Sequence, residues 1–311
     1  MQHAAPYRTF SGFLREHFGR RVQKITLDAG LSCPHRDKDK KGGCIYCNAR
    51  GSGTGAYAAG IGLKEQIEMQ MAAMKRRYKA DLFIAYFQSY TNTYAPLDRL
   101  KSIYDTILDY PEIVGLAIGT RPDCIDRDIL DLIESYTNSH LVWIEYGLQS
   151  ANDNTLKKIN RGHDVACFVD AVRLTSTYKM RICAHVIIGL PGEGMEDYLN
   201  TARLVSSLAV DDVKIHLLYV VKSTPMETLY RKGLYRPLEM DEYAHAVARF
   251  ISMLPKDMVI QRITGDPHPD ELVAPLWALD KRRVRDLIYS VMLEQGLYQG
   301  KYNSSENATN L

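Results

Sequence analysis

The chain has 311 residues, of which 46% are hydrophobic and 24% charged, the ordinary balance of a soluble globular protein. Thirty-nine Lys and Arg against 37 Asp and Glu give a formal net charge of +2, which excludes a globally basic nucleic-acid binder but permits local basic patches. No apolar run is long enough to span a membrane and no secretory signal is visible, so we expect a cytoplasmic protein whose six cysteines are not a disulfide scaffold.

Residues 1–24 form a basic and aromatic N-terminal extension. They hold five Lys and Arg against one acidic residue, with four aromatic side chains interleaved. Two hypotheses fit this pattern. Either the aromatic side chains pack on the body of the protein while the charges are solvated, or the segment is an arm that faces RNA.

From residue 25 to 235, short apolar runs alternate with segments of helical periodicity. The runs that predict strands are 25–27, 82–87, 113–119, 141–147, 182–189 and 213–221. The segments that predict helices are 63–78, 97–108, 129–133, 165–174 and 198–208. This alternation indicates a parallel sheet flanked by helices. Six units are too few for a full eight-unit barrel, so the pattern fits either an incomplete (β/α)6 TIM-like barrel or a doubly wound sheet.

Residues 236–300 break this rhythm and form an expected C-terminal α/β extension, followed by a flexible polar tail at 301–311. The extension contains a predicted helix at 240–254, a strand at 258–263 and a mostly helical end at 277–297. A basic cluster lies at 281–285, with further clusters at Lys38/Lys40/Lys41 and at 75–79. Each cluster alone is typical of a solvated face, and together they are compatible with an RNA ligand.

Three cysteines carry the strongest chemical signal, and we call them the loop cysteines: Cys33, Cys44 and Cys47. They occur as Cys33-Pro-His and Cys44-Ile-Tyr-Cys47 in the loop after the first predicted strand. Three thiolates with no fourth nearby suit a [4Fe–4S] cluster that keeps one iron open. A zinc site completed by His35, or unrelated packing cysteines, are the alternatives. The remaining cysteines lie in other units, and Cys167 and Cys183 are expected to be buried.

The loop cysteines resemble those of the radical S-adenosylmethionine (SAM) superfamily, and their long first gap is similar to that of the Elongator catalytic subunit. The resemblance continues through four further motifs in the same order. These are Gly119-Thr-Arg-Pro-Asp123, Glu145-Tyr-Gly-Leu-Gln149-Ser150, Asn160-Arg-Gly-His163 and Gly189-Leu-Pro-Gly192-Glu193. Nearly the whole chain resembles a stand-alone bacterial branch of that group, without the Elongator acetyltransferase domain. The resemblance favours the incomplete barrel over the doubly wound sheet.

The resemblance implies a role for individual residues. The loop cysteines would hold the [4Fe–4S] cluster, and SAM would be bound by residues of the later motifs. Its adenine would pack on Tyr46 and approach the backbone at Gly189 and Gly192, its ribose would bond to Gln149, and its carboxylate would pair with Arg161. The Gly-Gly-Glu segment that binds the SAM amino group in many relatives is absent, and residues 87–92 stand in its place.

Position at predicted strand ends suggests three catalytic candidates, Tyr90, Glu145 and His185, because reacting groups gather at the carboxyl ends of barrel strands. The alternative for Glu145 is a satisfied carboxylate in the barrel interior.

The implied reaction is cleavage of SAM to a 5′-deoxyadenosyl radical, with electrons from a flavodoxin or ferredoxin. The implied substrate is tRNA, whose wobble-uridine side chain would be converted from the carboxymethylaminomethyl towards the aminomethyl form. A radical SAM oxidation of a small molecule such as a porphyrin is the rival enzyme hypothesis. A zinc-stabilised RNA-binding or scaffold protein is the rival hypothesis without catalysis.

Overall fold

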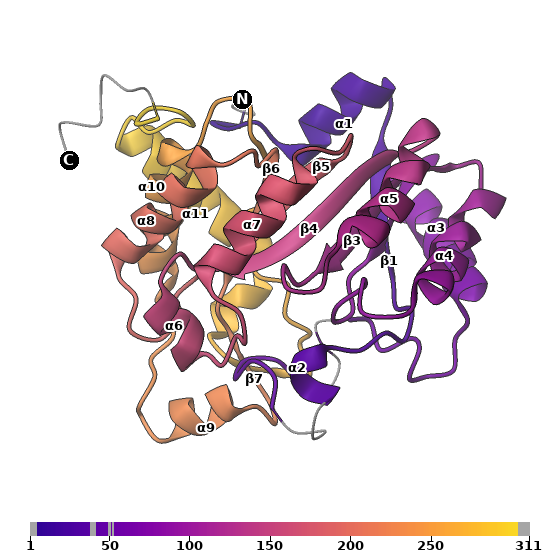
Figure 1. Cartoon of the computed structure of the whole chain (residues 1–311). Coiled ribbons are helices and arrows are strands. Elements are labelled where there is room, and N and C mark those ends of the chain that lie inside the picture. The colour runs from indigo at the N-terminus through magenta and orange to yellow at the C-terminus, as the bar shows by residue number, and fades with distance from the viewer. Residues whose placement is uncertain (1–4, 38–41, 49–50, 52, 304–311) are drawn as a thin grey trace.

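The computed structural model of the chain describes residues 5–37, 42–48, 51 and 53–303. Seven parallel strands form one curled sheet in which strand order follows chain order (Figure 1). The strands are β1 (Val22–Leu27), β2 (Leu82–Phe87), β3 (Ile113–Thr120), β4 (Leu141–Gln149), β5 (Arg181–Ile188), β6 (Asp212–Leu217) and β8 (Val259–Arg262). In the described residues, β1 and β8 share no hydrogen-bond ladder, so the barrel is open. The incomplete TIM-like barrel is confirmed.

Helices cover the outer face of the sheet (Figure 1). The longer helices between consecutive barrel strands are α3 (Leu63–Tyr78), α4 (Leu97–Asp105), α5 (Arg127–Ser135), α7 (Val165–Thr175), α8 (Met195–Ser207) and α10 (Met240–Met253). The shorter or peripheral helices are α1 (Phe10–Phe18), α2 (Pro34–Asp37), α6 (Asp153–Lys158), α9 (Pro225–Arg231) and α11 (Lys281–Glu294). The main apolar core lies between this layer and the sheet. None of the described helices has the length and apolar character needed to cross a bilayer.

The strand predicted at 213–221 is in fact two strands. β6 ends at Leu217, and the chain then leaves the barrel as β7 (Val220–Val221), which pairs antiparallel with β9 (Leu272–Ala274). The break falls inside a continuous apolar run, so hydrophobic pattern alone could not reveal it. The strand predicted at 258–263 pairs with β6 as a seventh barrel strand, although the sequence analysis placed it in the C-terminal extension.

The N-terminal segment plugs the barrel at the amino ends of its strands. Phe10 and Phe13 of α1 meet the ring of Trp143 edge-on, at centroid distances of 5.7 and 6.4 Å. These rings join an apolar cluster inside the sheet that includes Val22 and Val259. The aromatic residues therefore pack on the body, as the first of the two hypotheses predicts, and the segment lies at the end opposite to the carboxyl ends of the strands (Figure 1).

Candidate functional site

A cavity of about 310 Å³ opens at the carboxyl ends of the barrel strands. This is the end at which α/β barrels carry their reacting groups. The sequence-predicted residues that line it are the loop cysteines, Tyr46, Tyr90, Glu145, Gln149, Arg161 and His185. Gly189 and Gly192 are not among its lining residues, and Ile187 of β5 lines it instead. The contact of those two glycines with adenine stays a prediction.

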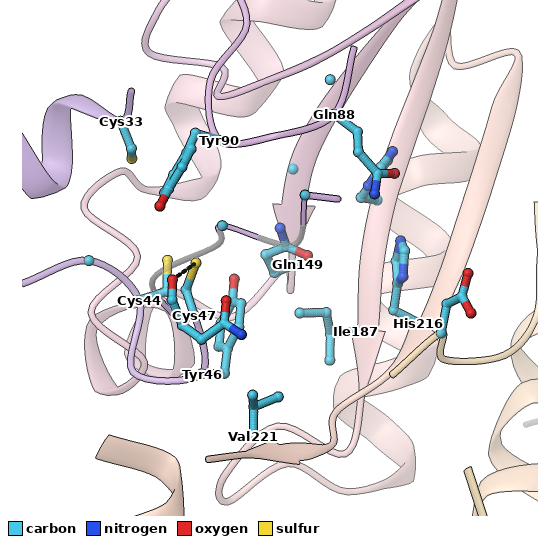
Figure 2. Close-up of a pocket in the computed structure, with 18 of the residues that line it drawn as sticks. Cys33, Cys44, Tyr46, Cys47, Gln88, Tyr90, Gln149, Ile187, His216 and Val221 are labelled. Atoms are coloured by element: carbon cyan, nitrogen blue, oxygen red, sulfur yellow. Dashed lines mark hydrogen bonds between the residues drawn. The ribbon is translucent and has the colours of Figure 1, made fainter. Parts of the chain in front are cut away.

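The loop cysteines lie at one side of the cavity (Figure 2). Cys33 immediately precedes α2, and a turn in which the Cys47 N–H donates to the Cys44 carbonyl (3.0 Å) brings the other two together. The loop is fixed to the segment after α6, because the Ile45 N–H donates to the Ile159 carbonyl at 3.0 Å. Asn160 Nδ2 also donates to the Gly43 carbonyl at 2.8 Å. These bonds fix Cys44 and Cys47, and all three loop cysteines line the same cavity.

The arrangement of the three thiols fits a cluster better than a single zinc ion. A mononuclear zinc site holds its sulfur ligands about 2.3 Å from the metal, which brings them close to one another. Among the described residues, the loop cysteines belong to no group of three ligand atoms within 4.8 Å of one another. The proposed fourth zinc ligand, His35, instead has its Nε2 at 2.8 Å from the Asn160 carbonyl. A [4Fe–4S] cluster spreads its cysteine ligands further apart and matches three donors.

Arg161 lies beside the loop cysteines, and not all of its N–H groups are used within the described residues. Its Nη2 donates to the Gly147 carbonyl at 2.7 Å, and its Nη1 lies 3.6 Å from Cys44 Sγ. Its Nε is buried and has no hydrogen-bond partner in the described part of the chain. A Cβ at residue 147 would lie 2.4 Å from Nη2, so only glycine admits this approach. A buried guanidinium with an unused N–H suits a carboxylate, such as that of SAM.

Gln149 and Tyr90 both adopt left-handed backbone conformations, with φ of 77° and 60°. The register of β4 against β5 shifts between Gly147 and Gln149, which turns the Gln149 side chain into the cavity (Figure 2). Such backbone costs on the order of 1–3 kcal/mol for a non-glycine residue and persists where surrounding structure enforces it. Both sequence-predicted residues are therefore held in place at the cavity edge.

The loop after β2, where a Gly-Gly-Glu segment is missing, offers other polar atoms. Ser89 and Thr91 are buried, and neither hydroxyl oxygen has a hydrogen-bond partner within the described residues. Thr91 lines the cavity. Unused hydroxyl oxygens can accept from an ammonium group, so this loop fits the amino end of SAM without a carboxylate.

Glu145 lies deeper, within an ionic layer across the barrel. Its carboxylate is fully buried and contacts Lys24 Nζ at 2.9 Å, His185 Nε2 at 2.8 Å and Lys214 Nζ. Burial alone would raise the pKa of Glu145, but Lys214 and Lys24 outweigh it and hold the pKa well below its usual range. Burial and Lys214 together lower the pKa of His185 to about 4. Glu145 is thus a satisfied interior carboxylate, and catalytic roles for it and His185 stay predictions.

Glu145, Cys183 and His185 also bring three ligand atoms within 4.8 Å of one another. Two ammonium groups already contact the carboxylate, which opposes binding of a metal cation there. Cys183 is buried as expected, whereas Cys167 on α7 is only partly buried, contrary to expectation. The apolar residues around Cys167 in the sequence predicted its burial, but its side of α7 is partly exposed to solvent.

The wall across the cavity from the loop cysteines was missed by the sequence analysis. It includes His216 at the end of β6 and Arg262, the last residue of β8 (Figure 2 shows His216). Tyr219 and the loop at Asp266 complete this side. Polar residues at the carboxyl end of a strand are the signal that could have found them. That signal was hidden because β8 was not assigned to the barrel.

The basic clusters are divided between the two ends of the barrel. The cluster at 281–285 begins α11, and Lys281 Nζ pairs with Asp266 at the cavity edge. The cluster at 75–79 ends α3, where Lys75 contacts Glu112 just before β3, at the amino end. Arg20 and Arg21 precede β1 at that same end, and Lys38, Lys40 and Lys41 lie outside the described residues. Among the basic clusters within the described residues, the 281–285 cluster is the one that reaches the cavity edge, through Lys281.

Comparisons with known proteins agree along almost the whole chain. Residues 32–205 match the model of the radical SAM superfamily, and residues 210–294 match that of its C-terminal domain. The chain is 38% identical over 297 residues to the uncharacterized protein YtqA of Bacillus subtilis, covering 95% of this chain and 92% of that protein.

More distant similarity extends to a tRNA uridine(34) acetyltransferase and to a solved Elp3 structure. A tRNA uridine(34) acetyltransferase of Dehalococcoides mccartyi is 29% identical over 174 residues, which is 55% of this chain and 37% of that protein. The solved structure of Elp3 from Methanocaldococcus infernus, with an N-terminal deletion, superimposes with a TM-score of 0.69 at 17% identity. It covers 89% of this chain and 64% of that chain, and it shows the shared fold.

Proposed function

The chain belongs to the radical SAM superfamily, and on that premise we propose that it modifies the wobble uridine of tRNA, converting a carboxymethylaminomethyl side chain to aminomethyl. The family makes the protein an enzyme whose cofactors are a [4Fe–4S] cluster and SAM. When bound, these cofactors would supply a 5′-deoxyadenosyl radical to remove one hydrogen atom from the carboxymethyl CH2 of the substrate. Return of a second electron to the cluster, with loss of a proton, would leave an imine, and its hydrolysis by water would release the two carbons as glyoxylate and leave the aminomethyl amine. The proposal concerns the substrate, the direction of the modification and the residues that serve it.

The chain's own residues would orient SAM and exclude water. The loop cysteines would hold the cluster, and Arg161 would bind the SAM carboxylate through its unused Nε. Thr91 would accept from the amino group, Gln149 would bond the ribose, and Tyr46 would cover the adenine. The apolar plug at the amino ends of the strands closes the far end of the barrel to solvent.

The observation that carries the tRNA proposal is a basic helix start beside the cavity that contains the loop cysteines. α11 begins with Lys281, Arg282 and Arg283, and Lys281 pairs with Asp266 of the cavity lining. Cations at the edge of a cavity bind and orient the phosphates of a nucleic acid, while the target base is turned out of the stack into the cavity. Similarity to the tRNA uridine(34) acetyltransferase supports the same substrate. A porphyrin-like substrate needs no such basic edge.

A cytoplasmic location, where tRNA is found, and a flavodoxin or ferredoxin as reductant complete the proposal. The zinc-stabilised scaffold is set aside, because the family is one of enzymes and the thiol arrangement does not suit a single ion.

Nucleoside analysis of tRNA from a strain lacking the gene tests the proposal. We expect 5-carboxymethylaminomethyluridine to accumulate while aminomethyl derivatives disappear. Re-expression of the wild type or of Cys167→Ala should restore the profile, and Cys44→Ala should not, because Cys167 lies on α7 and outside the cavity lining. An unchanged nucleoside profile in the deletion strain would contradict the tRNA assignment.

A further inference from the structure

Positive charge exceeds negative charge on the cavity side formed by β6 and β8. Four basic side chains lie there and in the ionic layer beneath, and among the described residues two carboxylates contact them. The basic side chains are Lys24, Lys214, Arg262 and Lys281, and the carboxylates are Glu145 and Asp266. Glu271, the other lining carboxylate, accepts a hydrogen bond from Asn48 at 2.8 Å, on the side of the loop cysteines. The β6–β8 side therefore holds more basic than acidic side chains in contact with one another, although burial lowers the pKa of Lys214 to about 7.

Arg262 is the cation of this group that lines the cavity with most of its donors unused. Its closest acidic contact is a loose one, with Nη2 at 3.6 Å from Asp266 Oδ2, and Asp266 is shared with Lys281. Within the described residues, Arg262 makes no hydrogen bond to another side chain. Its side chain is 31% exposed, so the guanidinium is reachable from the cavity yet partly shielded from bulk water.

His216 supplies a second observation at the same place. Its ring lines the cavity two residues beyond Lys214, which pairs in register with Arg262. Its Nε2 is shielded from solvent and has no hydrogen-bond partner within the described residues. Burial, and after it His185 and Arg262, hold the pKa of His216 well below its usual range, so the ring is neutral. A neutral ring with an unpartnered Nε2, next to a guanidinium group with unused N–H donors, can hold an anion.

We propose that Arg262, beside His216, forms a carboxylate subsite that binds the acidic end of the substrate side chain. The inference rests on the proposed function, because the carboxymethylaminomethyl group supplies that carboxylate. A separate anion site is needed, since Arg161 beside Cys44 serves the carboxylate of SAM at the other side of the cavity. The uracil at one end of the side chain and the carboxylate at the other end are then both held. The arm between them lies across the cavity, where its hydrogen atoms face SAM.

The carboxylate fits this position better than a phosphate of the RNA backbone does. A phosphodiester has a ribose on each side and stays at the surface, where it meets the exposed start of α11. Arg262 instead ends a barrel strand and lines the cavity at the carboxyl ends of the strands. An unbranched arm on an extruded base can enter such a cavity.

The test compares three anticodon stem-loop RNAs that differ only at the wobble side chain. One carries carboxymethylaminomethyluridine, one its neutral carbamoyl counterpart of the same size, and one aminomethyluridine. Affinity for the anaerobic holoenzyme is measured by fluorescence anisotropy. We expect the wild type to prefer the carboxylate over the carbamoyl RNA about tenfold, which equals about 1.4 kcal/mol. Arg262→Gln should abolish this preference, and Arg262→Lys should keep part of it because it retains the charge but loses the paired donors.

Arg282→Gln is the matched control, since it removes the same charge from a side chain that is 87% exposed on α11. It should weaken all three RNAs together and leave the preference intact. Equal binding of the charged and neutral RNAs by the wild type would overturn the subsite and leave the tRNA assignment standing. A preference that survives in both Arg262 variants would also overturn it. Failure of the wild type to bind any of the RNAs would overturn the tRNA assignment and this inference together.

Discussion

Glu145 offers the sharpest test of how the ionic layer supports the site. The change Glu145→Gln keeps the shape of the side chain and removes its charge. The amide oxygen can still accept from Lys24, but the amide N–H group then faces either His185 or the ammonium group of Lys214. Lys214 is 3% exposed, and burial lowers its pKa to about 7 even with Glu145 in place, so the variant must either keep a buried ammonium group without a counter-ion or release its proton.

The expected cost follows from the loss of this buried ion pair. Removing one partner of a buried ion pair destabilises a protein by roughly 3–5 kcal/mol. At about 2 °C per kcal/mol for a large domain, the unfolding midpoint should fall by roughly 6–10 °C. The double change Glu145→Gln with Lys214→Met removes both charges, and we expect it to recover at least half of the loss.

Thermal unfolding of the anaerobic protein, followed by circular dichroism, measures the stability of both variants. Formation of 5′-deoxyadenosine without tRNA measures SAM cleavage in parallel. We expect the double variant to keep this cleavage, because Glu145 lies below the residues assigned to SAM. An unfolding midpoint equal to that of the wild type in Glu145→Gln, or a double variant less stable than the single one, would refute the reasoning.

Three further predictions concern the cofactors and the RNA. Changing any of the loop cysteines to Ala should abolish the cluster absorption near roughly 400 nm and SAM cleavage, whereas Cys167→Ala should preserve both; a full cluster in any loop variant would contradict the assignment. Arg161→Ala should weaken SAM binding in equilibrium dialysis by about tenfold or more, and more than Arg161→Lys, with iron content unchanged; equal affinities would move the SAM carboxylate elsewhere. Affinity for tRNA should fall steeply as the salt concentration rises. Removing Arg282 and Arg283 should flatten the slope of log affinity against log salt by up to about one unit per lost phosphate contact, while a flat wild-type curve would count against RNA.

The barrel and the cysteine loop were predictable because both depend on local sequence. Apolar runs of strand length mark buried parallel strands wherever they occur, and three cysteines in one loop stay together in any fold. Gln149 and Arg161 were reached only through resemblance. Their separation of twelve residues says nothing about distance until β4 and the segment after α6 are placed.

The residues that the sequence analysis missed depend on contacts between distant strands. Lys24 was counted in a basic N-terminal cluster, yet it begins the ionic layer, because β1 starts at Val22 and directs it to Glu145 at 2.9 Å. Arg262 became part of the cavity only when β8 paired with β6. Its role could not be predicted from a strand assigned to a separate extension. Both cases depend on the register of strand pairing, which a single sequence does not reveal.

Incubating the anaerobic holoenzyme with SAM, a reductant and tRNA from the deletion strain tests the central claim most directly. Mass spectrometry of the digested tRNA is set against the amount of 5′-deoxyadenosine formed. The account predicts that aminomethyluridine appears as carboxymethylaminomethyluridine disappears, in proportion to 5′-deoxyadenosine, and that Cys44→Ala forms neither product. Steady formation of 5′-deoxyadenosine with an unchanged wobble nucleoside would contradict it.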